Sequence, residues 1–191
     1  IGRVEHVHVD DAVLDAAETC RRLGHEVEEI HCPFAGSVLD DFLDYWGLLA
    51  WLQTTSARIM LHRGFDTSRV EPWTSGLART FTDNKRKVAA AVARLYRFEH
   101  RYAEVMRRWD VLVSPTIAQP AVPLRYIAGD CAFDEVYQRL RAYCCFTPIQ
   151  NAAGAPAISL PLGRSDGGLP IGVQLAGRFG DDRVLLELAL Q

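Results

Sequence analysis

The most constraining feature of this sequence is the segment from residue 146 to residue 177, which contains two short apolar runs. The runs at 157–160 and 171–176 have the length of β-strands, and a stretch rich in Gly, Ser and Asp separates them. A turn-forming stretch between two apolar runs is typical of a β-hairpin or of two neighbouring strands. The segment therefore predicts part of a buried β-sheet.

The residues just before the first of these strands favour an irregular backbone path. Gly154 and Pro156 allow a tight approach of the main chain, and Asn151 can hydrogen-bond nearby main-chain groups and hold a turn. Phe146 offers apolar surface of the kind that lines ligand pockets. We expect an irregular loop here, with Asn151, Gly154 and Pro156 as its structural residues.

Helical patterns surround these strands. Asp10 can cap a helix that ends before Gly24. Helices are expected at residues 11–23, 37–62, 84–109 and 133–145, further strands at 26–30 and 111–113, a break in the helical pattern at 64–83 and a loop at 116–131. The predicted fold class is α/β, with part of a mixed β-sheet core flanked by α-helices.

Composition limits the classes of function. The 191 residues are 49% hydrophobic, enough for a globular domain with a sizeable core. A net charge of -3 gives no basic excess for nucleic acid or an anionic membrane, and no stretch has the pattern of a membrane span or signal peptide. Five cysteines, an odd number, favour a reducing compartment, so we expect a cytoplasmic protein.

The segment from residue 146 reads FTPIQNAAGAPAISLPLGRSDGGLPIGVQLAG. It resembles the C-terminal region of amidase-signature enzymes, where T-P-x-x-N-x-x-G-x-P-A-x-S-x-P-x-G is followed by G-L-P-x-G-x-Q. The stretches LGHEVEE at 23–29, EPWT at 71–74 and WDVLVSPT at 109–116 also resemble that family. The matching positions are Thr147, Pro148, Asn151, Gly154, Pro156, Ala157, Ser159, Pro161, Gly163, Leu169, Pro170, Gly172, Gln174, Asp182, Leu185 and Leu186.

The resemblance implies a hydrolase that splits a small-molecule carboxylic amide through a Ser, cis-Ser, Lys triad, without a metal or organic cofactor. Residues 1–191 then correspond to the C-terminal part of a single amidase domain, whose N-terminal part carries the Gly/Ser-rich signature. The start at Ile1 without a methionine and the end at Gln191 inside a helical pattern agree with a cut piece. Such a piece is expected to need its missing N-terminal part to fold.

No catalytic residue is expected within the chain. Its only lysines, Lys85 and Lys87, lie beside Arg86 in a basic run, which favours a solvated helix face over a buried base. Its serines form no Gly-Ser-Ser cluster and no G-x-S-x-G motif. His6 and His8 lack the ligand spacing of a zinc site, so no metal is expected.

Substrate-binding residues are expected on the resemblance, since this part of the chain approaches the substrate in relatives. They are Cys144, Cys145, Phe146 and Thr147, with plain core packing as the alternative. Trp46 is a further candidate for a substrate wall, although aromatic residues on a helix usually pack in the core.

Two other functions remain open from the sequence. An amidotransferase A subunit resembles these enzymes, but the stretch AYCCFTPIQN before Asn151 has no acidic residue to bind the ammonium group of glutamine. A non-catalytic fragment that only binds small molecules or partners is the second alternative. A homodimer is compatible with the sequence, and no nucleic acid partner is expected.

Overall fold

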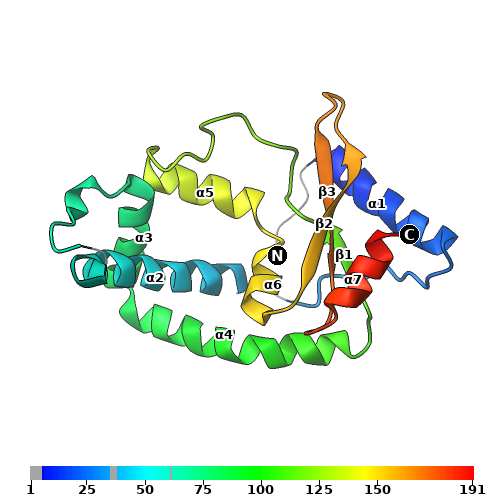
Figure 1. The fold of residues 1–191 in the computed structure, drawn as a ribbon, viewed down its shortest axis with the longest axis horizontal. Coiled ribbons are helices and arrows are strands. Elements are labelled where there is room, and N and C mark those ends of the chain that lie inside the picture. Colours follow the sequence, from blue (N-terminus) through cyan, green and yellow to red (C-terminus); the bar gives the residue numbers. More distant parts are fainter. Residues whose placement is uncertain (1–5, 35–37, 61) are drawn as a thin grey trace.

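The computed structural model describes residues 6–34, 38–60 and 62–191. It has two parts that share one long helix (Figure 1). A small β-sheet with α1 and α7 forms one part, and α2, α3 and α5 form a helical lobe. Helix α4 (Lys85–Met106) runs along both. The α/β fold class is confirmed.

The sheet contains β1 (Leu112–Pro115), β2 (Ala157–Arg164) and β3 (Pro170–Ala176) in the order β1-β3-β2. Both pairings are antiparallel, so the described residues form no parallel pair of the kind a mixed sheet needs. The predicted hairpin is confirmed as β2 and β3. A register shift between Leu160 and Gly163 lets β2 extend beyond the predicted strand.

Helix α1 (Val7–Arg22) covers one face of the sheet. Its buried Val9, Ala12 and Ala16 pack against Ile171 and Val173 of β3. The approach of α1 to β2 is close because Gly163 of β2 lies against Ala12 of α1. A Cβ added to Gly163 would lie 2.5 Å from the Cβ of Ala12. The helix begins at Val7 with His6 as its N-cap, so the predicted cap at Asp10 is wrong. Asp10 instead lies in the first turn, where a negative charge favours the helix dipole.

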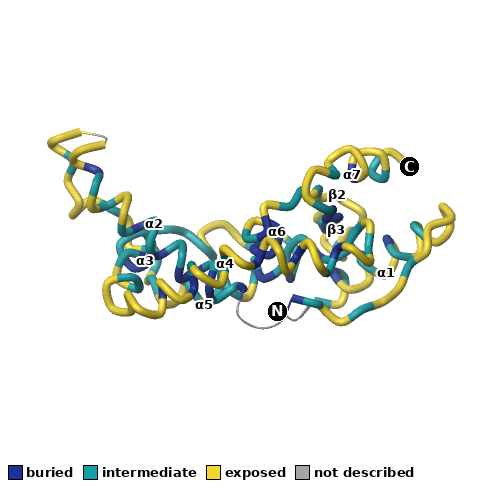
Figure 2. Tube along the Cα trace, turned by 90° about the horizontal axis from the view of Figure 1, so that it is seen from below, coloured by how far each residue is buried: buried dark blue, intermediate teal, exposed yellow. Residues whose placement is uncertain are grey.

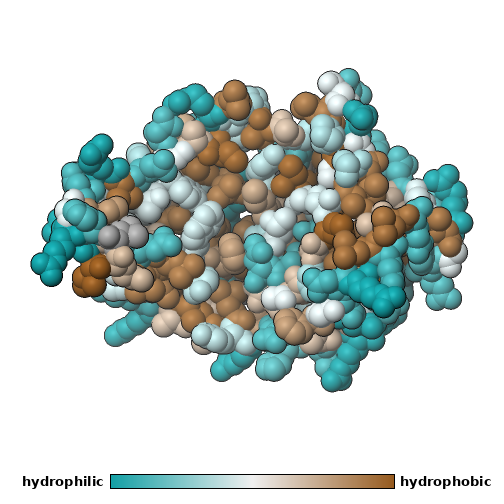
Figure 3. Space-filling model, in the orientation of Figure 1, coloured by the Kyte–Doolittle hydropathy of each residue, from teal (hydrophilic) through white to brown (hydrophobic). Residues whose placement is uncertain are grey.

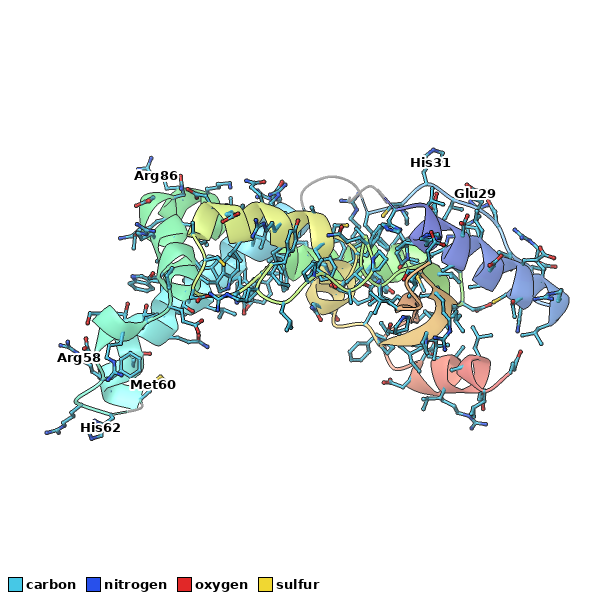
Figure 4. All side chains as sticks on the ribbon, turned by 90° about the horizontal axis from the view of Figure 1, so that it is seen from above. Glu29, His31, Arg58, Met60, His62 and Arg86 are labelled. Carbon is cyan, nitrogen blue, oxygen red and sulfur yellow. The ribbon has the colours of Figure 1, made fainter. Side chains whose placement is uncertain are left out.

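The predicted strand at 26–30 is wrong. Residues 25–32 form no helix or strand and are mostly exposed, and Glu29 and His31 point outward from the body (Figure 4). A strand exists only through hydrogen bonds to a neighbour. None of the described residues pairs with this segment, so an alternating pattern alone does not make it a strand.

The helical lobe contains α2 (Val38–Met60), α3 (Pro72–Asp83) and α5 (Phe133–Tyr143). The predicted helices at 37–62 and 133–145 are confirmed within these bounds, while positions 37 and 61 lie outside the described residues. The expected break at 64–83 is wrong for its second half, which is α3. Pro72 begins α3 at a position that tolerates proline, and the buried Gly76 lies against the ring of Phe133.

The remaining elements are short: a 3-10 turn η1 (Thr67–Arg69), α6 (Pro148–Ala153) and α7 (Asp182–Ala189). The predicted loop at 116–131 is confirmed. Buried residues run along the middle of the molecule, whereas the end of α2 projects with exposed residues (Figure 2). Among the described helices, none combines the length and apolar character that crossing a bilayer requires.

The main apolar core lies where α4, α6 and the start of α2 meet. It contains Phe34, Val38, Phe98, Tyr102, Met106, Ile149 and Ala153. Phe34 stacks on Tyr102 with ring centroids 5.1 Å apart. Leu112 of β1 packs against this core, while the next residue, Val113, packs against the α1 cluster. The two faces of the sheet are therefore covered by different elements, as alternating strand side chains require.

Candidate functional site

The loop that leaves β1 meets the end of α5. The N–H of Ala118 donates a 3.0 Å hydrogen bond to the carbonyl oxygen of Tyr143. This bond places residues 144–147 next to the C-terminal end of β1, where the chain leaves the sheet. In the space-filling view, hydrophobic residues gather around the middle of this face, between the helical lobe and the sheet (Figure 3).

Polar side chains share the sheet face that lies opposite α1. Gln174 of β3 is flanked in register by Ser114 of β1 and Ser159 of β2. Gln174 is only 4% exposed, and its Nε2 donates a 3.4 Å hydrogen bond to the Oγ of Ser114. The α1 face of the same strands is apolar, whereas the opposite face combines the packing of Leu112 with the side-chain hydrogen bonds of Ser114, Gln174 and Ser159.

Two hydroxyls complete this polar face. Thr116 Oγ1 and Ser159 Oγ lie 2.7 Å apart and share a hydrogen bond in which either can donate. The N–H of Thr116 donates to the carbonyl of Gly172, which extends the pairing of β1 with β3. The hydroxyl pair thus spans β3 from one edge strand to the other.

The predicted substrate segment is partly buried where it joins α5 to α6. Cys145 is buried, while Cys144, Phe146 and Thr147 are partly exposed. Burial raises the pKa of the Cys144 thiol, so this cysteine stays protonated near neutral pH and is a poor nucleophile. The segment is therefore partly open to solvent, and it presents no activated sulfur at Cys144.

The expected irregular loop after Phe146 is wrong in its middle, because residues 148–153 form the helix α6. Pro148 starts the helix and Gly154 ends it with a left-handed φ of 66°, a conformation that glycine adopts without strain. Pro156 accepts a 3.0 Å hydrogen bond at its carbonyl from the N–H of Gly177. Asn151 is exposed on α6, and its side chain makes no hydrogen bond within the described part of the chain.

A buried hydrogen bond, which sequence reasoning missed, joins α4 to the turn after β3. The phenol of Tyr102 donates a 2.9 Å hydrogen bond to the carbonyl of Gly177. Burial raises the pKa of Tyr102 to about 12. In the sequence, Tyr102 falls in an apolar helical pattern, and nothing in that spacing marks a hydrogen bond to Gly177.

Trp46 lies away from the predicted substrate segment. Its ring contacts Trp73 of α3 with centroids 5.5 Å apart and Phe42 at 6.3 Å, and Trp73 in turn meets Phe133 of α5. These half-buried rings form an aromatic cluster that joins α2, α3 and α5. The segment 144–147 lies beside the sheet, while Trp46 is half-buried in the aromatic cluster of the lobe, so its role as a substrate wall stays a prediction.

Both lysines are exposed, whereas His6 and His8 at the start of α1 are half-buried, with the Nδ1 of His6 buried and without a hydrogen-bond partner among the residues that the structure describes. Lys85 and Lys87 lie exposed at the start of α4, where Arg86 also points outward (Figure 4), and Lys87 pairs with Asp44 at 3.1 Å. His8 forms a 3.0 Å pair with Asp166. In residues 6–34, 38–60 and 62–191, no group of three or more His, Cys, Asp or Glu side chains is arranged to hold a metal ion.

Comparison with known proteins places this arrangement in a family. The family model described as Amidase matches residues 4–186. The AmiC protein of Mycobacterium tuberculosis strain H37Rv, which is named as an amidase, is 39% identical over 184 residues, covering 96% of this chain and 39% of the relative. The chain therefore spans about two fifths of the length of such relatives.

Solved structures show the same fold. A 6-aminohexanoate cyclic dimer hydrolase matches with a TM-score of 0.80 and 24% identity, covering 96% of this chain and 40% of that one. The A subunit of the glutamyl-tRNA(Gln) amidotransferase from Thermotoga maritima matches with a TM-score of 0.66 and 25% identity, covering 98% and 38%.

Proposed function

Since this chain belongs to the amidase family, we propose that it forms the C-terminal, substrate-facing part of an enzyme that hydrolyses a carboxylic amide. The products are a carboxylate and ammonia or an amine. The family match over residues 4–186 carries this proposal. The junction between the sheet and residues 144–147 supports it with a surface suited to an uncharged polar substrate.

The catalytic residues lie outside these 191 residues in this proposal. A serine hydroxyl attacks a carbonyl only when a neighbouring base removes its proton. Among the described residues, the hydroxyls of Thr116 and Ser159 bond to each other, and both lysines are exposed at the start of α4. A Ser, cis-Ser, Lys triad elsewhere in the polypeptide supplies the nucleophile, forms an acyl-enzyme and releases the amine, and water then frees the carboxylate.

The substrate side is the segment Cys144–Thr147 in this proposal. Phe146 contributes apolar surface for the acyl group, and Cys144 and Thr147 contribute small side chains beside it. Gly154 and Pro156 fix the path from α6 into β2. Asn151 faces outward, so its bracing role requires a partner in the part of the polypeptide beyond this chain.

The free edge of β2 is the second surface that the rest of the enzyme covers. β2 lies at the edge of the sheet, and alternate residues along it are exposed. An unpaired strand edge promotes association with other strands. We assign this edge to pairing with the remaining part of the same amidase domain in a cytoplasmic enzyme.

An amidotransferase A subunit is the second candidate function. The similarity to the Thermotoga maritima protein favours it. The absence of an acidic residue in the run from Ala142 to Asn151 favours the hydrolase, because the ammonium group of glutamine binds best next to a carboxylate.

Amide turnover by the full-length protein tests the proposal. The protein is incubated with propionamide, hexanamide, benzamide and glutamine, and carboxylate and ammonia are quantified. Equal amounts of both products from the simple amides support a hydrolase. Turnover of glutamine alone supports the amidotransferase function, and turnover of none of the four by folded protein contradicts both.

A further inference from the structure

We propose that the hydroxyl pair of Thr116 and Ser159 binds the amide group of the substrate. The inference rests on the proposed amidase function and assigns a binding role to two residues outside the segment Cys144–Thr147. Neither residue acts as a nucleophile, because no basic side chain within the described residues hydrogen-bonds either hydroxyl.

The central strand makes room for the pair. A Cβ added to Gly172 would lie 2.8 Å from the Oγ of Ser159 and 2.9 Å from the Oγ1 of Thr116. Any residue other than glycine would push the hydroxyls apart. The 2.7 Å bond across β3 therefore depends on an absent side chain at Gly172.

The pair keeps hydrogen-bonding capacity for a ligand. Each hydroxyl has one proton to donate and two lone pairs. One proton is used in the mutual bond, so one proton and several lone pairs remain, and this bond lies at the exposed surface. A carboxamide, which both donates and accepts, matches what remains.

Other hydroxyls in the chain are engaged differently. Thr54 and Thr80 donate to carbonyl oxygens of their own helices, at 2.8 and 2.7 Å, as helical threonines commonly do. Ser114 donates to the carbonyl of Pro115. Within the described residues, the Thr116 and Ser159 hydroxyls bond to each other and not to the main chain.

The surroundings favour a neutral group over an anion. The neighbours on this sheet face are Ser114, Gln174 and Gly172, which carry no charge. The adjoining segment 144–147 also contains no basic residue. No cation among the described residues of this sheet face attracts a carboxylate, so the site suits the amide substrate better than the acid product.

Kinetics of the full-length enzyme test the pair. Thr116→Val, Ser159→Ala and the double variant are compared with Thr54→Val, whose hydroxyl bonds to its own helix. We expect each single change to raise the KM for propionamide about 5- to 10-fold, and the double variant to show less than the product of the two effects. For the control Thr54→Val, both the melting temperature and the KM should stay near the wild-type values.

Two readouts separate the proposals. If wild type hydrolyses no amide, the proposed function fails, and the pair is judged by calorimetric binding of benzamide, which the two changes must weaken. An unchanged KM, or unchanged benzamide affinity, in both single variants overturns the binding role. A fall in melting temperature with KM unchanged would show that the pair only fastens the three strands.

Discussion

Arg94 on α4 donates two hydrogen bonds, of 2.8 and 2.6 Å, to the carboxylate of Asp41, which is buried in α2 with 3% exposure. Asp44, one turn further along α2, pairs with Lys87, and Asp40 pairs with Arg141 of α5. These ion pairs join α2 to α4 and α5. They hold the helical lobe against the helix that supports the sheet.

Replacing Arg94 should destabilise the protein. Arg94→Ala leaves the buried carboxylate of Asp41 without its partner, and an unpaired buried charge is strongly unfavourable. The melting temperature of the full-length protein should fall by several degrees. Arg97→Ala, an exposed arginine on the same helix, is the control and should change it little. Equal melting temperatures for the two variants would contradict a stabilising role for this pair.

Tyr102 should make stability sensitive to alkaline pH. Folding raises its pKa from 10.0 to about 12, mainly because the phenol is buried. The stability that the neutral, buried phenol contributes is therefore fully present below pH 10. It is lost as pH rises from 10 through 12, because the tyrosine of the unfolded chain ionises at a lower pH than that of the folded chain. Tyr102→Phe should cost about 1 kcal/mol at pH 8 through the lost bond to Gly177. The free energy of unfolding of Tyr102→Phe should then decline less between pH 10 and 12 than that of the wild type.

Urea unfolding between pH 8 and pH 11.5 measures this difference. Tyr96→Phe, at a tyrosine that is 81% exposed, serves as the control. Parallel curves for wild type and Tyr102→Phe above pH 10 would contradict the raised pKa.

Gly76 should tolerate no side chain. A Cβ at this position would lie 2.1 Å from the ring of Phe133, so Gly76→Ala must separate α3 from α5. Overpacking of this kind costs about 1–3 kcal/mol. Gly167→Ala in the hairpin turn, where the nearest atom would be 3.8 Å away, should be close to neutral. Denaturant unfolding of both variants decides, and equal stabilities would show that the ring of Phe133 moves aside freely.

Phe146 should govern which acyl groups are accepted. Phe146→Ala enlarges the space next to Cys144 and should shift preference toward longer or bulkier acyl chains, with a small change in kcat for the best short substrate. Trp46→Phe, in the aromatic cluster of the lobe, should alter stability more than selectivity. Steady-state kinetics over amides of increasing chain length test this. An identical profile for wild type and Phe146→Ala would remove this residue from the pocket.

Much of the fold could be predicted from local patterns. The hairpin of β2 and β3, the long helix α4 and the left-handed Gly24 at the end of α1 follow from apolar spacing and glycine chemistry. The strand at 26–30 failed because pairing depends on a neighbour that the pattern does not contain. Helix α3 was missed because Pro72 and Gly76 usually interrupt a helical pattern, although here one starts the helix and the other packs against Phe133.

The site was predictable only in part. The family resemblance drew attention to residues 144–147, and the structure places them beside the sheet. The hydroxyl pair was missed because Thr116 and Ser159 are 43 residues apart and meet only through the register of β1 and β2 on β3. The remaining signal was Gly172, a glycine inside a strand, which often marks a close approach of other groups.

Covalent labelling of the nucleophile tests the central claim, that this chain belongs to an amide hydrolase and supplies its substrate side but not its catalytic serine. The full-length protein is treated with a fluorophosphonate, digested, and the modified serine is located by mass spectrometry. We predict a single labelled serine outside residues 1–191, with amide hydrolysis lost in proportion to labelling. A stoichiometric label on a serine within this chain, such as Ser114 or Ser159, would contradict the account.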